Sequence, residues 1–185
     1  ALAGRRGSRF NLQLAGDIAP ERIAVAARGD YAGREISMPR RAVLLKAPDG
    51  GWALQKTQLS FGGGFVIAEG RFGGDEPARG RISLADMPLS LLDVVSGDMG
   101  LGGTISGIVD VGSGPGGVPT GEARVMVDNL SRSGLVLTSR PIDLALVARL
   151  SPTQLTARAV MQDEGETRGR LQARISNLPA TGGMT

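Results

Sequence analysis

The sequence predicts an all-β protein: an elongated, curved, mainly antiparallel sheet, forming a U-shaped or taco-like groove, with one short helix near residues 88–96. Hydrophobic residues alternate with polar or small ones along most of the chain, which is the period of a half-buried strand. The 29 glycines have no collagen-like period, and the short connections are rich in Gly, Pro, Asn and Asp, as is typical of hairpins and meanders. With 41% hydrophobic residues, the chain can bury enough surface to fold.

The alternation predicts about eleven strands. They cover residues 10–14, 23–27, 42–46, 52–61, 65–72, 79–85, 105–111, 119–128, 142–148, 155–161 and 171–175. With neighbouring strands ~4.8 Å apart, one continuous sheet of this size would run about 50 Å.

Turn-forming residues separate the predicted strands. We expect breaks at Gly16-Asp17 and Gly29-Asp30, and turns at residues 48–51 and 73–75. Inside strand 52–61 the apolar phase shifts, so we expect a bulge near Lys56-Thr57.

One segment departs from the β pattern. Residues 88–96 place Leu91, Leu92 and Val95 at helical spacing behind Pro88, a residue suited to a first helical turn. This spacing predicts a short helix that ends at Gly97.

The absence of His and Cys limits the chemistry of the chain, because there is no imidazole base, thiolate nucleophile or His- or Cys-ligated metal. Residues 112–117 match G-x-G-x-x-G, but a dinucleotide site needs a helix after the motif, and here a strand follows. We interpret this segment as an inter-strand loop. We therefore expect no enzyme, no catalytic residue, no cofactor and no metal.

The charged residues indicate solvated turns and faces. Asp75-Glu76 and Asp163-Glu164 with Glu166 lie beside glycines in predicted turns, whereas catalytic carboxylate pairs need burial or a fixed separation. The net charge is +3, acids alternate with arginines, and the chain has one Trp and one Tyr. A nucleic-acid binder shows a basic stripe with stacking aromatics, so we expect no nucleic-acid partner.

The alternating aliphatic residues are the most informative feature. They are Val, Ile, Leu and Ala, and aromatic residues make up only 3% of the chain. Two interpretations stay open: a filled core, or a trough that small side chains leave open. In the trough, alternate apolar residues would line a lipid groove while Arg, Asp and Thr point outward. The predicted lining is Leu12, Leu14, Ile23, Val25, Ile82, Leu84, Ile105, Val109, Val125, Val127, Leu144, Leu146, Leu155, Ala157, Leu171 and Ile175.

We treat residues 1–185 as a single fragment of a repetitive β-groove protein and expect it to be an internal piece of a longer chain. Residues 79–88, which begin Arg-Gly-Arg and end Met-Pro, are echoed by residues 168–179. This echo predicts repeat units 1–97 and 98–185. Chance recurrence in a chain rich in Arg and Gly is the open alternative.

Two stretches resemble a known family. Residues 82–92 (ISLADMPLSLL) precede 101–107 (LGGTISG), and residues 38–71 combine alternating apolar residues with spaced glycines. From Phe10 to Pro179 this pattern resembles the TamB family, the translocation and assembly module subunit within the AsmA-like bridge-type lipid-transfer superfamily. The resemblance consists of glycine and apolar spacing, without a diagnostic catalytic residue.

The resemblance implies a protein anchored in the inner membrane of a Gram-negative bacterium, which crosses the periplasm as a long bent sheet with an apolar concave face. It implies an Omp85-type (TamA-like) outer-membrane partner, reached through the parent protein, and phospholipid acyl chains as ligands. The implied function is outer-membrane biogenesis, by passing phospholipid along the groove, by assisting outer-membrane protein assembly, or both.

A second class of function stays open. A closed β-solenoid or an adhesin-like passenger segment would show the same alternation, but it would have a packed interior and bind through its outer face. The two classes differ in whether the apolar face is open or filled.

Overall fold

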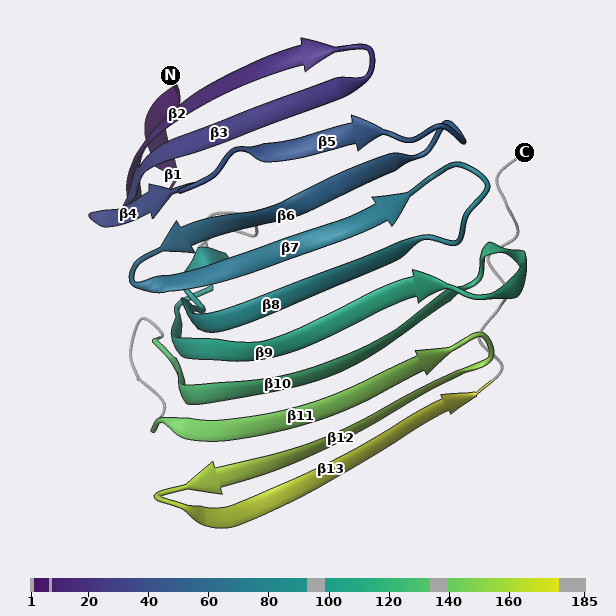
Figure 1. Ribbon diagram of the computed structural model, residues 1–185. Helices are drawn as coiled ribbons and strands as arrows, with labels where there is room; N and C mark the ends of the chain where they lie inside the picture. Colours follow the sequence, from purple (N-terminus) through teal and green to yellow (C-terminus); the bar gives the residue numbers. More distant parts are fainter. Residues whose placement is uncertain (1, 7, 93–98, 134–139, 177–185) are drawn as a thin grey trace.

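The computed structural model describes residues 2–6, 8–92, 99–133 and 140–176. Its strands form one 13-stranded antiparallel sheet that follows the chain as a meander from β1 to β13. Figure 1 shows the strands stacked in sequence order, many of them bent along their length. The predicted elongated, curved, all-β fold is therefore confirmed.

The strands are β1 (Leu2–Arg6), β2 (Ser8–Ala19), β3 (Arg22–Tyr31), β4 (Arg34–Ser37), β5 (Ala42–Lys46), β6 (Trp52–Phe61), β7 (Gly64–Phe72), β8 (Arg79–Pro88), β9 (Leu101–Ser113), β10 (Pro119–Arg132), β11 (Ile142–Ser151), β12 (Gln154–Asp163) and β13 (Glu166–Ser176), with a 3-10 turn η1 (Pro115–Gly117) after β9. β4 and β5 both pair with β3 on one side and β6 on the other. They are two parts of one interrupted strand. Pro39 lies in the interruption and lacks the N–H that a ladder requires.

Strands β5 and β6 match their predicted bounds, but two predicted breaks are wrong. β2 runs through Gly16-Asp17, which pair with Val25 and Ala24 of β3, and β3 continues past Gly29-Asp30 to Tyr31. Glycine and aspartate are turn signals only where the chain has no partner strand, and here the ladder keeps both pairs extended. The four-residue β4 and the N-terminal β1 were not predicted.

The helix predicted near 88–96 falls partly outside the described residues, which end at Leu92 in this segment. Pro88 ends β8 instead of opening a helix, and the Leu92 N–H donates to the Leu89 carbonyl at 2.9 Å in the turn that follows. Residues 93–96 are not described. The sheet itself continues across the predicted unit boundary at 97/98, because β8 pairs with β9.

Bulges keep apolar residues on one face where the alternation slips. The register of β6, β8 and β10 shifts between Leu54 and Thr57, between Leu84 and Met87, and between Val127 and Leu130. The first of these is the predicted bulge near Lys56-Thr57. In the other two, Asp86 and Asn129 have φ of 46° and 55°. Their N–H groups leave the ladder and donate to Ser106 Oγ and Asp143 Oδ1, both at 2.9 Å.

The pairing register sorts the side chains into two faces. Between β6 and β13, three cross-strand rows of directly paired residues share one face, which we call the apolar face; the opposite face is the polar face. The rows are Thr57, Ala68, Ile82, Val109, Ala123, Ala148, Ala157 and Ala173; then Leu59, Val66, Leu84, Gly107, Val125, Leu146, Ala159 and Leu171; then Leu54, Gly70, Gly80, Val111, Gly121, Leu150, Leu155 and Ile175. No charged residue occurs in these rows.

Glycines allow neighbouring strands to approach closely on the apolar face. A Cβ on Gly107, which has φ of 151°, would lie 2.2 Å from the Arg124 carbonyl oxygen. A Cβ on Gly64 would lie 2.2 Å from the carbonyl oxygen of Asp86. Both glycines face the apolar side, so a side chain at either position would collide with the backbone of the neighbouring strand.

The main buried cluster lies on the apolar face, near the ends of β3, β6 and β8. Tyr31, Phe61 and Met87 are 6%, 1% and 2% exposed. Leu91, from the segment after β8, packs against them together with Ile36, Val66, Leu84 and Ile105. The Leu89 N–H donates to the Gly103 carbonyl at 3.0 Å, and Arg34 Nη1 hydrogen-bonds Ser90 Oγ. This end of the apolar face is therefore filled, and we call these residues the end cluster.

Truncating Phe61 tests the end cluster. Phe61→Ala removes a fully buried ring, and we expect it to cost about 3–5 kcal/mol of unfolding free energy in urea denaturation. Ile18→Ala on the same face is the control, because Ile18 is 85% exposed and its truncation should cost less than about 0.5 kcal/mol. Equal losses for both variants would show that the cluster is not a core.

Candidate functional site: an open apolar face and a polar face with an arginine pocket

Every residue predicted to line a groove lies on the apolar face. The register continues from the β6–β13 rows to the N-terminal strands, because Leu54 pairs with Leu44 and Leu44 with Ile23. Leu12 and Leu14 lie on the same face because they pair with residues of β3 that share it. Val127 pairs directly with Ile105 and with Leu144, and these three residues extend the apolar face toward the end cluster. The structure thus places the predicted set on one surface. Whether that surface binds lipid stays a prediction.

No second layer covers most of this face in the described part of the chain. Leu14, Val111, Leu171 and Ile175 are 52%, 50%, 64% and 51% exposed, whereas a sheet ordinarily buries its apolar face against another layer. Only seven hydrophobic residues of the described chain are buried: Ala24, Tyr31, Phe61, Met87, Leu89, Val127 and Ala159. Contiguous exposed apolar surface is a common feature of interaction sites.

A hollow in the apolar face lies away from the end cluster. It has a volume of about 320 Å³, near the lower end of ligand-pocket sizes. Gly70 and Gly80 pair directly and leave its floor without side chains, while Leu54, Ile82 and Val111 contribute to its walls. Such a hollow can accept a hydrocarbon chain.

The polar face carries a cross-strand row of charges. Arg81 and Asp110 are directly paired, with Nε to Oδ1 at 2.6 Å and Nη2 to Oδ2 at 3.2 Å. This hydrogen bond raises the pKa of Arg81 and lowers that of Asp110. Glu122 accepts from Arg124 at 2.7 Å and from Arg149 at 3.3 Å, and these contacts lower its pKa. The row keeps this face hydrated while the opposite face is apolar.

Asp49 ties the turn before β6 to the turn after β7. Its Oδ2 accepts from Arg71 Nη2 at 2.8 Å and from the N–H groups of Asp75 and Glu76 at 3.2 and 3.4 Å. Its Oδ1 accepts from the Gly51 N–H at 3.2 Å. Burial alone raises the pKa of Asp49, but the hydrogen bonds from Arg71 and the backbone outweigh it and hold that pKa below its ordinary 3.8.

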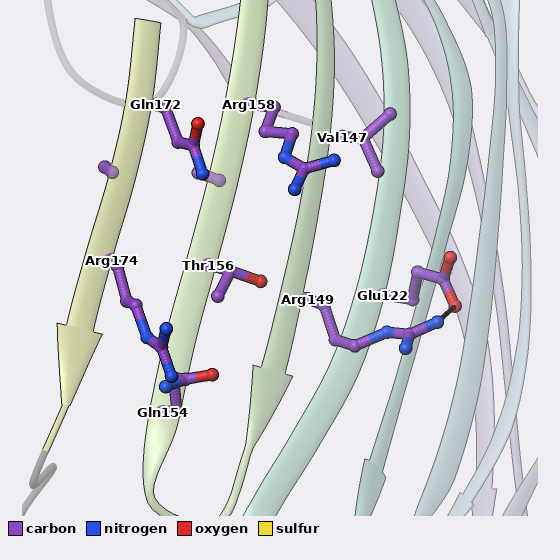
Figure 2. Close-up of a pocket in the computed structure, with 10 residues that line it drawn as sticks. Glu122, Val147, Arg149, Gln154, Thr156, Arg158, Gln172 and Arg174 are labelled. Atoms are coloured by element: carbon purple, nitrogen blue, oxygen red, sulfur yellow. Dashed lines mark hydrogen bonds and ion pairs between the residues drawn. The ribbon is translucent and has the colours of Figure 1, made fainter.

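An arginine-lined pocket of about 360 Å³ lies on the polar face across β10 to β13. Figure 2 shows Arg149, Arg158 and Arg174 around it, with Thr156 between them. Thr156 pairs directly with Arg149 on one side and with Arg174 on the other. We call this group the arginine pocket.

Neither a metal site nor a membrane-spanning helix is found within the described ranges. Their His, Cys, Asp and Glu side chains form no group of three or more suited to a metal ion. No helix there is long and apolar enough to cross a membrane. Comparison with protein-family models, with curated proteins and with solved structures gave no match for this chain.

The sequence reasoning missed both the Asp49 contacts and the arginine pocket. Asp49 lies in a predicted turn, but Arg71 and the Asp75 N–H, which both donate to it, come from more than 20 residues further along the chain. Arg149, Arg158 and Arg174 are scattered in sequence and meet only through strand pairing. A signal existed in their alternation with apolar residues, which assigns all three to the same face.

The lowered carboxylate pKa values predict acid sensitivity. Because the pKa values of Asp49, Asp110 and Glu122 are lower in the fold than in the unfolded chain, their ionised forms stabilise the fold above their ordinary values. That contribution to stability is lost as the pH falls through the pKa values that these carboxylates have in the folded protein. We expect the unfolding free energy to stay level from about pH 7 to 5 and to decline below about pH 4.

The variant Asp49→Asn tests the contribution of Asp49, whose carboxylate accepts four hydrogen bonds. The variant should be less stable at pH 7 and should show a shallower decline in acid, measured by urea denaturation across the pH series. Glu35→Gln is the control, because Glu35 is exposed and has no side-chain hydrogen bond or ion pair within the described ranges. If the unfolding free energy of the Asp49→Asn variant declined in acid as steeply as that of the unchanged protein, Asp49 would not contribute to the acid sensitivity.

Proposed function

We propose that this chain is a segment of an inner-membrane-anchored periplasmic protein that supports outer-membrane biogenesis in a Gram-negative bacterium, by passing phospholipid along the apolar face, by assisting outer-membrane protein assembly, or both. The observation that carries the proposal is an uncharged apolar face that continues over β6 to β13 and lacks a covering layer in the described residues. The resemblance to TamB proteins supports it and adds an Omp85-type partner, reached through the parent protein.

The energetics of the apolar face suit a sliding acyl chain. Contact with apolar side chains stabilises a bound acyl chain by about 0.8 kcal/mol for each buried CH₂. Aliphatic residues and glycines repeat from strand to strand. An acyl chain that moves from β11 to β10 therefore leaves Leu146 and meets its direct partner Val125, a similar aliphatic side chain. Movement along the sheet then needs neither a nucleotide nor a chemical step.

The arrangement of the two faces suits a lipid whose acyl chains contact the apolar face while its headgroup stays in water. Acyl chains can lie on the apolar face while a charged headgroup stays in water at its edge, because burying an unpaired charge is costly. The end cluster fills one end of this face near β3 to β9, and the hollow beside Gly70 and Gly80 leaves room at the other. We place acyl chains on that open side.

A packed β-solenoid or adhesin-like segment is the competing function. It requires a filled interior, whereas the described strands belong to a single sheet with half-exposed aliphatic residues on its apolar face. The open face therefore favours lipid binding over a purely structural interior.

Photo-crosslinking tests the proposal. We expect a photoreactive residue at Val125 or Leu144 to capture phospholipid, and one at Arg124 or Asp143 to capture little, because adjacent residues point to opposite faces. Mass spectrometry of the crosslinked protein gives the readout. Capture of unfolded outer-membrane protein instead of lipid at the same positions would assign the face to protein assembly.

Val147 is the sharper control. It is hydrophobic and 49% exposed but lies on the polar face, directly paired with Arg124. A photoreactive residue there separates the effect of the face from the effect of exposure. Equal lipid capture at Val147 and Val125 would refute a groove confined to the apolar face.

A further inference from the structure

The arginine pocket has more positive than negative charge. Arg149, Arg158 and Arg174 line it, and among its lining residues Glu122 is the one carboxylate. Glu122 is already engaged by Arg124, which approaches Oε1 with both Nε and Nη2 at 3.1 and 2.7 Å. Arg149 reaches the other oxygen at 3.3 Å. The local charge is therefore not balanced by protein groups.

The remaining two guanidinium groups have no carboxylate partner among the described residues. Arg174 faces the side-chain amide of Gln154, whose oxygen accepts from Nε and Nη2 at 2.7 Å each when the amide is turned to present it. Arg158 makes no hydrogen bond or ion pair with any residue that the structure describes. Guanidinium groups left in this state at a concave surface are available to a ligand.

Strand geometry places the three arginines within side-chain reach of one another. Arg149 and Arg174 flank Thr156 on adjacent strands, so their Cα atoms are about 9.6 Å apart, and Arg158 lies two residues along the strand from Thr156, about 7 Å away. Arginine side chains of this length can meet over Thr156, whose hydroxyl can also donate. Figure 2 shows these residues on one surface.

We propose that the arginine pocket binds a phosphate group, either free or in a phosphate ester. Guanidinium groups pair with phosphate oxygens in a planar, two-bond geometry, and a phosphate offers enough oxygens for all three arginines. The pocket volume of about 360 Å³ is roughly twelve times the ~30 Å³ share of one water molecule, which leaves room for an esterified group. This site lies on the face opposite the proposed acyl-chain groove.

Calorimetric titration of the chain at low ionic strength tests the site. Inorganic phosphate and glycerol 3-phosphate probe the free source, and short-chain phosphatidylglycerol below its micelle concentration probes a lipid headgroup. We expect Arg158→Gln to weaken binding of the preferred probe about tenfold, the effect of losing one charge-assisted hydrogen-bond pair. Arg158→Lys should recover only part of the loss, because lysine lacks the planar fork.

Arg28→Gln is the matched control. Arg28 is an exposed arginine on the polar face of β3, where it pairs with Gln13 and Ser37 far from the pocket. Its replacement should change binding less than about twofold. Tightest binding of phosphatidylglycerol identifies a lipid source, and tightest binding of phosphate or glycerol 3-phosphate a soluble one; both support the site. Absence of binding by all probes, or equal weakening in Arg28→Gln and Arg158→Gln, overturns it.

Discussion

Side-chain alternation along paired strands is the constraint on which both surfaces of this sheet depend. Neighbouring residues point to opposite faces, so a register error of one residue would exchange the aliphatic rows for the arginines and acids. In β10 this alternation holds for ten consecutive paired residues, Pro119–Asp128, before the bulge. The antiparallel ladder enforces it, because each strand inherits its register from the previous one.

The bulges show how the chain preserves that register where its sequence slips. Leu84 and Met87 are three residues apart yet share the apolar face, because Asp86 takes a positive φ and steps out of the ladder. A hydroxyl from Ser106 accepts its freed N–H, which would otherwise lack a partner. Asn129 and Asp143 repeat this arrangement in β10 and β11. The polar side chains at the bulges thus maintain the apolar face.

Much of the fold could be predicted from the sequence, because alternation is a local property. It located β5 and β6, assigned the groove residues to one face, and revealed the bulge near Lys56-Thr57 from the phase change alone. It failed at Gly16-Asp17, where pairing with β3 outweighs the turn preference of both residues. β4 is short and depends on β3 and β6 for its hydrogen bonds, so its own residues carried little signal.

The functional sites differ in how far the sequence predicts them. The apolar lining follows from which residues alternate, but the arginine pocket depends on which strands are neighbours. Arg149 and Arg174 are 25 positions apart (174 − 149) and come to flank Thr156 only because β11, β12 and β13 form consecutive antiparallel pairs.

A single-layer sheet also explains how one short segment can present two such different surfaces. Ala157 and Ala173 contribute to the arginine pocket, although their side chains belong to an apolar row. The arginines need water or an anion, since desolvating an unpaired guanidinium is costly, and the aliphatic rows need to leave water. A second protein layer on the polar side would desolvate the arginines, whereas a layer on the apolar side would bury the aliphatic rows. The single layer of the described residues keeps the arginines hydrated and leaves the aliphatic rows open to the acyl chains that we propose, with the backbones of β12 and β13 separating the two environments.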